Sequence, residues 1–255
     1  MENKKKEKTK IDIILPNYNS SQFIIRTIKS ILNQTYKSWK LIIVDDFSNK
    51  ETKDILKKFS KKNKIKIYWS NKNRGAGYSR NFAIKKSNSP YLAFIDSDDV
   101  WKKDKLKKQI SFMKKNNCSF SYTNYETFGD KNKKVDSPSK LSYSSFIKNT
   151  SIATSTMMVK RNKINNIKFT NTKICEDYFF KCKLLKKVNF ALCLNQYLTK
   201  YRVRRGSLQS SNLKNFYWIW KINRDFNKLN FLNNLISLFF ISLNSLKKYG
   251  GKNIF

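Results

Sequence analysis

The chain has 255 residues, with 54 lysine or arginine residues against 17 aspartate or glutamate residues, which gives a formal net charge of +37 at pH 7. Hydrophobic residues make up 40% and aromatic residues 15%, which suffices for a packed core and argues against global disorder. The sequence contains no histidine, which excludes Ser-His-Asp and Cys-His nucleophilic systems and any histidine general base. An enzyme of this composition would need a carboxylate as its base and a metal ion, arginine or lysine as its electrophile.

The positive charge has two interpretations. Lysine, asparagine, isoleucine, phenylalanine and tyrosine are abundant together, which indicates compositional drift toward A/T-rich codons. The alternative is a polyanionic partner, such as an anionic membrane surface or a phosphate-rich substrate. We expect no nucleic acid partner, because no known nucleic-acid-binding module is present.

Membrane spans and secretion signals are not expected. No uncharged apolar stretch reaches the roughly 20 residues that a span needs, and no apolar segment follows the basic N-terminus. Four scattered cysteines form no C-x-x-C pair and are expected to be buried reduced thiols. The sequence therefore predicts a cytoplasmic protein, at most peripheral on the inner face of the cytoplasmic membrane.

The first half of the chain alternates short apolar runs with helical periodicity. Strands are predicted at residues 11–15, 41–44, 65–69 and 91–95, each followed by a helix with apolar residues three or four apart. Ser20 or Ser21 is expected to cap the first helix. Four successive β-then-α units predict a mostly parallel, doubly wound sheet, whose strands end at one edge, where ligands bind.

The second half is less regular. Strands are predicted at residues 120–128, 155–159 and 190–194, a polar loop at 130–145 and a helix at 177–185. Residues 215–248 are expected to form one or two amphipathic helices rich in Phe, Trp and Leu. We therefore predict a basic N-terminal tail (1–10), one catalytic domain (11–210) and an amphipathic helical C-terminal extension (211–255).

Three carboxylates directly follow the fourth predicted strand. Asp96, Asp98 and Asp99 stand within four residues and repel one another unless a cation neutralises them. Oxygen ligands suit Mg²⁺ or Mn²⁺, and such an ion can bridge diphosphate oxygens. The alternative is that Asp98 and Asp99 cap the following helix. Their position at a strand end, with a second acidic pair nearby, favours the metal site.

Two other segments carry potential ligand-binding groups. Asp45 and Asp46 end the second predicted strand, where a carboxylate can bind a base N–H or ribose hydroxyl, or cap a helix. Residues 73–81 combine two glycines with Arg74 and Arg80, which suits a phosphate at a helix start. Arg80 stands where a G-x-G-x-x-G fingerprint needs its third glycine, so this is no dinucleotide motif.

The acidic pair Glu176 and Asp177 precedes a predicted helix. On spacing alone these residues are first-turn acids; the functional alternative is a general base that deprotonates an acceptor hydroxyl. Farther along, Arg202, Arg204 and Arg205 could close over a diphosphate, or could be surface charge.

Seven segments in order resemble the family-2 glycosyltransferases of the GT-A fold. They are residues 13–19, 30–36, 42–48, 73–81, 94–99, 176–178 and 201–207, which span roughly residues 11–210. The resemblance implies a nucleotide-sugar-binding set made of Pro16, Tyr18, Asp46, Arg80, Asp96, Arg202 and Arg204. It further implies that Asp98 and Asp99 hold Mn²⁺ or Mg²⁺, and that Asp177 is the catalytic base with Glu176 beside it.

The reaction implied by this resemblance is an inverting single displacement. An acceptor hydroxyl would attack the anomeric carbon of a nucleoside-diphosphate sugar as the nucleoside diphosphate leaves on the metal. Family members often carry a histidine where Arg204 stands, so leaving-group stabilisation here would be purely cationic. The Q-x-x-R-W motif of processive synthases is absent. Transfer of a single sugar to a glycan or lipid-linked acceptor, in surface polysaccharide or lipopolysaccharide synthesis, is therefore expected.

The amphipathic tail and basic surface would suit docking on an anionic membrane that holds the acceptor. Two other functions stay open. A nucleotidyltransferase that makes a nucleotide sugar also uses a doubly wound sheet with acidic metal ligands, although its usual Gly- and Arg-rich loop is missing. A non-enzymatic basic protein that binds polyanions is the second, and would bind in a salt-sensitive way without regard to metal.

Overall fold

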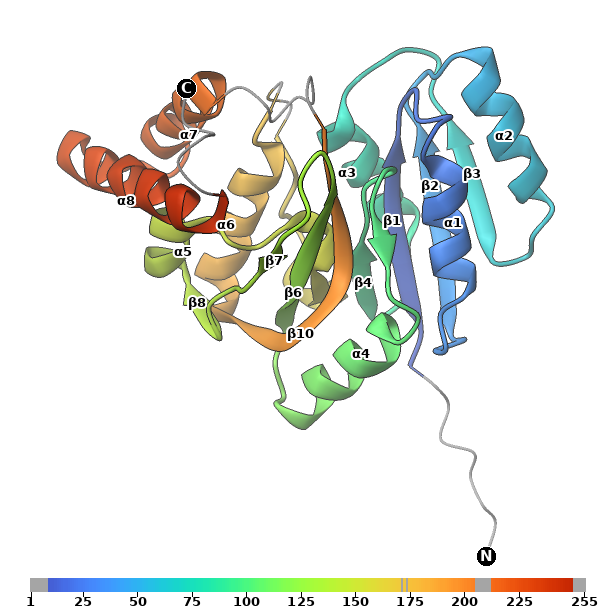
Figure 1. Ribbon diagram of the computed structural model, residues 1–255, viewed down its shortest axis with the longest axis horizontal. Helices are drawn as coiled ribbons and strands as arrows, with labels where there is room; N and C mark the ends of the chain where they lie inside the picture. The colour runs from blue at the N-terminus through green and yellow to red at the C-terminus, as the bar shows by residue number, and fades with distance from the viewer. Residues whose placement is uncertain (1–8, 171, 173, 205–211, 250–255) are drawn as a thin grey trace, which may run out of the picture.

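The computed structural model describes residues 9–170, 172, 174–204 and 212–249. In this part of the chain a ten-stranded sheet has the order β3-β2-β1-β4-β9-β6-β10-β5, with β7 paired to β6 and β8 paired to β10 (Figure 1). The strands are β1 (Ile11–Asn17), β2 (Trp39–Asp45), β3 (Ile65–Trp69), β4 (Tyr91–Phe94), β5 (Val100–Trp101), β6 (Phe120–Gly129), β7 (Lys134–Val135), β8 (Lys140–Ser142), β9 (Met158–Lys160) and β10 (Phe190–Val203). The helices are α1 (Ile24–Leu32), α2 (Lys50–Ser60), α3 (Ala76–Lys86), α4 (Lys105–Lys115), α5 (Tyr143–Asn149), α6 (Glu176–Val188), α7 (Asn212–Asp225) and α8 (Phe231–Tyr249).

The N-terminal half is the predicted parallel, doubly wound unit. Strands β3, β2, β1 and β4 are all parallel, so their carboxyl ends meet at one edge. Alternate residues of β1 enter different cores: Ile13 and Leu15 pack with α1, α2 and α4, whereas Ile14 packs with α3, α5 and α6. Burial on both faces explains why these strands are nearly continuous apolar runs.

The second half of the sheet is mixed. Strand β9 runs antiparallel to both β4 and β6, while β10 is parallel to β6 and antiparallel to β5 and β8. The predicted α/β fold is therefore confirmed, and its parallel order is restricted to the first four strands. Because β6 and β10 run parallel, their carboxyl ends also share an edge, at Gly129 and Val203.

Several local predictions were wrong. Neither Ser20 nor Ser21 caps α1: its N-cap is Phe23, without a side-chain hydrogen bond, and the Ser20 carbonyl instead accepts the first amides. The predicted polar loop at 130–145 contains β7, β8 and the start of α5. The predicted strand 190–194 continues to Val203 through irregular pairing after Leu194. Such short or interrupted elements have too few residues to produce a periodic signal.

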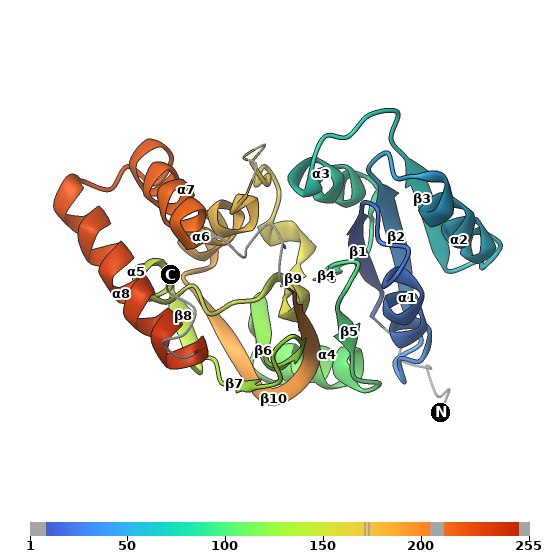
Figure 2. The same cartoon turned by 45° about the horizontal axis from the view of Figure 1, so that its top comes forward.

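The described part of the predicted C-terminal extension forms the two helices α7 and α8, which lie beside α5 and α6 (Figures 1 and 2). Ile219 and Ile222 of α7 and Ile241 of α8 join the core that α6 also enters. Among the described residues, no helix combines the length and apolarity needed to cross a membrane. The four cysteines are free thiols, and three of them are buried.

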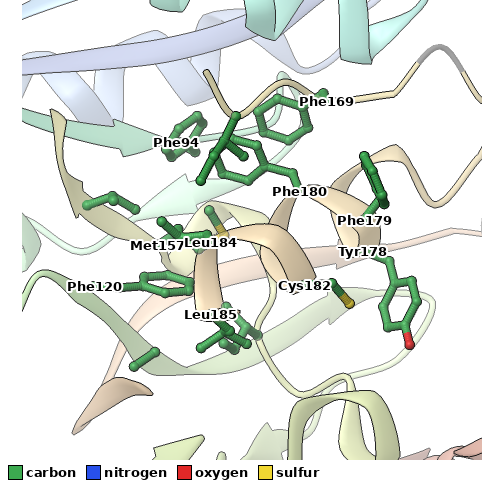
Figure 3. Close-up of a cluster of buried hydrophobic side chains, with 14 of the residues drawn as sticks. Phe94, Phe120, Met157, Phe169, Tyr178, Phe179, Phe180, Cys182, Leu184 and Leu185 are labelled. Carbon is green, nitrogen blue, oxygen red and sulfur yellow. The ribbon is translucent and has the colours of Figure 1, made fainter. Parts of the chain in front are cut away.

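An aromatic cluster attaches α6 to the parallel half of the sheet. Phe169 and Phe180 stack with their ring centroids 4.0 Å apart, and Phe94 at the end of β4 lies 6.0 Å from each. Figure 3 shows these three rings together on one side of α6, with Phe179 and Tyr178 on the other. The first turn of α6 is thereby fixed beside the end of β4.

A buried lysine destabilises this fold at neutral pH. Lys105 is fully buried; its Nζ donates to Gln109 Oε1 at 2.7 Å and lies 4.3 Å from the Trp101 ring centroid. Burial lowers its pKa from 10.5 to about 7. Because the folded pKa is below the unfolded one, the cost of charge burial is full below pH 7 and is relieved as the pH rises toward 10.5.

We therefore predict that Lys105→Met stabilises the protein by about 2 kcal/mol at pH 6, after allowing for the lost Gln109 bond. The gain should shrink between pH 7 and pH 9.5, as measured by urea unfolding across that range. Lys108→Met removes an exposed charge from the same helix and should show no such pH dependence. A pH-independent effect of Lys105→Met would contradict the assignment.

Candidate functional site

Acidic residues from two segments, the loop after β4 and the start of α6, meet at the carboxyl edge of the sheet around Arg80 of α3. This guanidinium donates to Glu176 Oε1 at 2.5 Å and to Asp96 Oδ1 at 2.6 Å, and its side chain is only 5% exposed. Burial would lower the pKa of Arg80, but the charges of Asp96, Glu176 and Asp177 raise it above its usual value. Arg80 thus joins α3, the loop after β4 and the start of α6 into one site.

The Asp98–Asp99 pair is crowded and poorly neutralised. Asp99 is buried; its Oδ1 accepts the Arg202 amide at 2.8 Å, while its buried Oδ2 has no hydrogen-bond partner among the described residues. Burial, together with the charges of Asp98 and Asp96, raises the pKa of Asp99 well above its usual range, although the nearby Ser155 hydroxyl and the Arg202 amide oppose the shift. Burial and the charge of Asp96 raise the pKa of Asp98 as well, although Arg204 opposes the shift.

These aspartates do not cap a helix. Strand β5 follows them directly, and α4 begins only at Lys105. The Thr27 hydroxyl donates to the carbonyls of Ser97 and Asp99, at 3.0 and 2.8 Å, which ties the loop to α1. The capping alternative is therefore wrong for Asp98 and Asp99.

The same carboxylates suit a divalent cation. Mg²⁺ in proteins commonly takes only one or two carboxylates, with substrate phosphates and water as its other ligands. The described residues contain no group of three or more His, Cys, Asp or Glu side chains arranged to hold a metal by themselves. The unpartnered Oδ2 of Asp99 and the raised pKa values of both aspartates fit an ion shared with a phosphate ligand.

Asp45 and Asp46, at the end of β2, fix neighbouring loops at the same carboxyl edge of the sheet. The carboxylate of Asp46 accepts the amides of Arg74 and Gly75, at 3.0 and 2.6 Å, and so fixes the loop before α3. Asp45 accepts from the Asn17 amide at 2.7 Å. Neither residue caps α2, which Asn49 caps. Binding of a base by Asp46 stays a prediction.

The two glycines of residues 73–81 have structural roles. Gly75 has φ +88°, a conformation that favours glycine, and Gly77 packs so tightly against the Thr170 carbonyl and the Glu176 side chain that a Cβ would collide. Gly77 therefore permits close packing against the chain itself, where we expected approach to a ligand. Of the residues predicted to line a nucleotide pocket, Pro16 is buried within β1 and Tyr18 is half exposed beyond its end.

Asp177 lies in the first turn of α6 and is held through one oxygen. Its Oδ2 accepts from Lys181 Nζ at 2.6 Å and from the Thr154 hydroxyl at 2.7 Å. Burial alone would raise the pKa of Asp177, but the charges of Lys181 and Arg80, with these two hydrogen bonds, lower it well below its usual range. Asp177 is therefore ionised at neutral pH.

Lys181 and Thr154 are site residues that the sequence analysis missed. The Lys181 side chain is 4% exposed, one turn after Asp177. The i, i+4 spacing of opposite charges was the available signal for Lys181. Thr154, which belongs to a short 3₁₀ turn before β9, had none.

The basic run at the end of β10 adjoins the acidic loop. Arg202 Nε donates to the Asp98 carbonyl at 3.2 Å, and its guanidinium lies over the Phe23 and Phe128 rings. Arg204 Nε is 3.8 Å from Asp98 Oδ2. Arg205, the third member of this run, lies outside the described residues. Two cationic side chains thus stand next to the candidate metal ligands.

Comparisons with known proteins match these features. Residues 12–181 match the model of Glycosyl transferase family 2. The "Putative teichuronic acid biosynthesis glycosyltransferase TuaG" of Bacillus subtilis (strain 168) is 35% identical over 87% of this chain and 90% of that protein. The UDP-Glc:alpha-D-GlcNAc-diphosphoundecaprenol beta-1,3-glucosyltransferase WfgD of Escherichia coli is 35% identical over 85% of this chain and 86% of that protein.

Solved structures share the fold. S. aureus TarS 1–349 in complex with UDP-GlcNAc superposes with a TM-score of 0.73 at 22% identity, covering 94% of this chain and 73% of that one. The mannosyltransferase PcManGT from Pyrobaculum calidifontis, in complex with GDP-Man and Mn²⁺, gives a TM-score of 0.70 at 12% identity, covering 94% and 70%. The GT-A fold expected from the sequence is confirmed.

Proposed function

Because the chain belongs to glycosyl transferase family 2, we propose that it moves one sugar from a nucleoside-diphosphate sugar to a hydroxyl of a glycan or lipid-linked acceptor, with inversion and with Mn²⁺ or Mg²⁺. One observation carries the proposal: the crowded Asp98–Asp99 pair and the ionised Asp177 share one edge, joined through the ion pairs of Arg80. The proposed leaving-group site and the proposed base are thus held next to each other at one edge of the sheet.

Asp177 is the proposed base. Among the described residues, the hydrogen bonds to Asp177 from Lys181 and Thr154 both go to Oδ2, which leaves Oδ1 to accept the proton of an acceptor hydroxyl. The hydroxyl oxygen forms a bond to the anomeric carbon as the bond from that carbon to the diphosphate oxygen breaks, and the bonding electrons pass to the diphosphate. A carboxylate of low pKa takes the proton late, once bond formation has made the hydroxyl acidic.

Asp98 and Asp99 would hold the divalent cation, which, when bound, neutralises charge on the leaving diphosphate. Arg202 and Arg204 add positive charge at the same place, since Arg204 lies against Asp98 and Arg202 against the Asp98 carbonyl. Arg80, buried between two carboxylates, keeps α3 and α6 in position and is proposed to act near the donor.

The substrates are proposed from the relatives. The name of WfgD pairs a UDP-glucose donor with a diphosphoundecaprenol-linked acceptor, and that of TuaG refers to teichuronic acid biosynthesis. By analogy we propose a UDP-sugar donor, a lipid-diphosphate-linked acceptor and a role in surface polysaccharide synthesis. The protein would then work at the cytoplasmic face of the membrane, as a peripheral protein.

A thermal-shift screen tests the donor class. UDP, GDP, CMP and dTDP sugars are each added with Mn²⁺, and we expect a UDP-sugar to raise the melting temperature most, with the rise abolished by EDTA. Diphosphate release from a nucleoside triphosphate and a sugar phosphate would instead indicate a nucleotidyltransferase. Stabilisation by any polyanion, independent of Mn²⁺, would indicate a polyanion-binding protein.

Lys181 is expected to keep Asp177 ionised. Since Lys181 lowers the pKa of Asp177, we predict that Lys181→Met raises the pKa of the Asp177 carboxyl by about 1 pH unit or more, as measured by NMR titration of that carboxyl. Lys181→Arg, which keeps the charge, should leave the titration nearly unchanged, and Lys183→Met is the matched control on the exposed side of α6. An unshifted Asp177 titration in Lys181→Met would reduce Lys181 to a structural role.

A further inference from the structure

Helix α8 buries Asn234, Ser237 and Ile241 but leaves most of its large apolar side chains exposed. Its buried face includes Asn234 and Ser237. Its outer face, which we call the α8 apolar face, consists of side chains that are 37% to 69% exposed: Phe231, Leu232, Leu235, Phe239, Phe240 and Leu243. Figures 1 and 2 both show α8 at the edge of the molecule, on the side away from α2 and β3.

Hydrogen bonds fix this orientation. Asn223 of α7 donates to Asn234 Oδ1 at 3.1 Å and to Ser237 Oγ at 3.0 Å, and accepts from the Tyr178 hydroxyl of α6 at 2.8 Å. The Ser237 hydroxyl donates to the Ile147 carbonyl of α5 at 2.6 Å. Rotating α8 to bury its apolar face would leave these buried polar groups unpaired. An inward rotation of α8 therefore cannot cover this apolar face without breaking these hydrogen bonds.

The charge around α8 indicates what covers the face. Residues 212–249 contain six lysine or arginine residues and one acid, Asp225, whose carboxylate already pairs with Arg224 at 2.8 Å. Lys148 of α5 adds its ammonium 5.6 Å from the Phe240 ring centroid. A second copy would bring another net charge of +37 and repel the first. An exposed apolar face with Lys148 beside it, on a chain of net charge +37, matches an anionic lipid surface.

We propose that the α8 apolar face inserts into the headgroup–acyl boundary of an anionic bilayer, with α8 parallel to the membrane plane. A helix that lies in this boundary needs an exposed apolar face and nearby basic side chains. Helix α8 has the face, and Lys148 of α5 lies beside it. This inference deepens the proposed function, on which it rests for the lipid-linked acceptor, by naming the surface that reaches the membrane.

Vesicle flotation tests the proposal. The full chain is mixed with phosphatidylcholine vesicles with or without 30% phosphatidylglycerol, and we expect binding to the anionic vesicles. Leu232→Ser/Phe239→Ser should lower the partition coefficient at least 10-fold, since each substitution removes an inserted side chain. Leu235→Ser, a milder second variant, should lower it about 3-fold or more. Ile25→Ser, which replaces a 39% exposed residue on α1, should leave it unchanged.

Three results would overturn the proposal: no wild-type binding to anionic vesicles, equal binding by the wild type and both α8 variants, or a self-association that the α8 variants abolish without any vesicle binding. Transfer to a water-soluble acceptor is measured in parallel. Equal turnover by the wild type and the variants would show that the active site is intact. Weaker vesicle binding by the variants would then be due to the changed α8 apolar face. Absence of transfer by all of them, with vesicle binding as expected, would refute the proposed function and leave the lipid contact standing.

Discussion

Replacing Asp177 with asparagine is expected to lower kcat by about 10²- to 10⁴-fold, the range that a positioned general base contributes. Asparagine has nearly the same shape and can still accept from Thr154, but it cannot take a proton from the acceptor hydroxyl. The dissociation constant of UDP, measured by titration with Mn²⁺ present, should change by less than about 3-fold, because the substitution leaves the contacts to the bound nucleotide in place.

A control separates the loss of the base from the loss of stability. Asp177→Asn leaves the buried ammonium of Lys181 without its carboxylate, which is destabilising by about 3–5 kcal/mol for a buried pair. Asp177→Asn/Lys181→Met removes both charges, so we expect it to recover most of that stability without recovering activity. Substantial turnover by either variant, above about a tenth of wild type on the scale of these effects, would refute the base assignment.

Replacing Asp99 with asparagine is expected to reduce transfer by about 10²-fold or more and to remove the Mn²⁺ dependence of nucleotide binding, since a buried charged ligand of the ion is lost. Asparagine keeps an oxygen for the Arg202 amide, so the loop after β4 should hold its shape. The measurement is calorimetric titration with UDP in the presence and absence of Mn²⁺.

Stability provides a second readout for Asp99. Burial and neighbouring charges raise its folded pKa, so stability from this group is lost as the pH rises from the unfolded pKa through the folded one. At pH 7 without metal, Asp99→Asn should therefore be more stable than wild type, whereas wild type should gain more on adding Mn²⁺ and UDP. Asp54→Asn, an exposed change on α2, should do neither. An Mn²⁺ response of Asp99→Asn equal to that of wild type would exclude Asp99 as a ligand.

The parallel half of the fold could be predicted because its strands are buried on both faces and each is followed by an amphipathic helix. The apolar runs at residues 11–15, 41–44 and 91–95 became β1, β2 and β4, and the acidic residues after two of them meet at one edge as expected. Local pattern and chain direction determine that much of the structure.

The partners of the site residues could not be predicted in the same way. Asp177 and Thr154 come together through the packing of α6 against the end of β4, which no periodicity encodes. Asp46 is engaged by the amides of Arg74 and Gly75, so its carboxylate has a loop-fixing role that its position alone did not indicate. Hydrogen bonds between distant segments depend on the finished tertiary structure.

Helix α8 shows another limit. The sequence predicted an amphipathic segment, and the usual expectation is that the apolar side of such a helix faces the core. Here Asn234 and Ser237 face inward because Asn223 and the Ile147 carbonyl offer them hydrogen bonds. Periodicity defines two faces of a helix, whereas the surrounding polar groups decide which one is buried.

The proposed reaction is tested most directly by the configuration of its product. UDP-glucose, whose sugar is α-linked to the diphosphate, is incubated with the protein, Mn²⁺ and a lipid-diphosphate-linked sugar, and the new linkage is assigned by ¹H NMR. A single displacement with Asp177 as base predicts a β-linked product and one UDP released per bond formed. An α-linked product, or turnover only with a nucleoside triphosphate and diphosphate release, would contradict it.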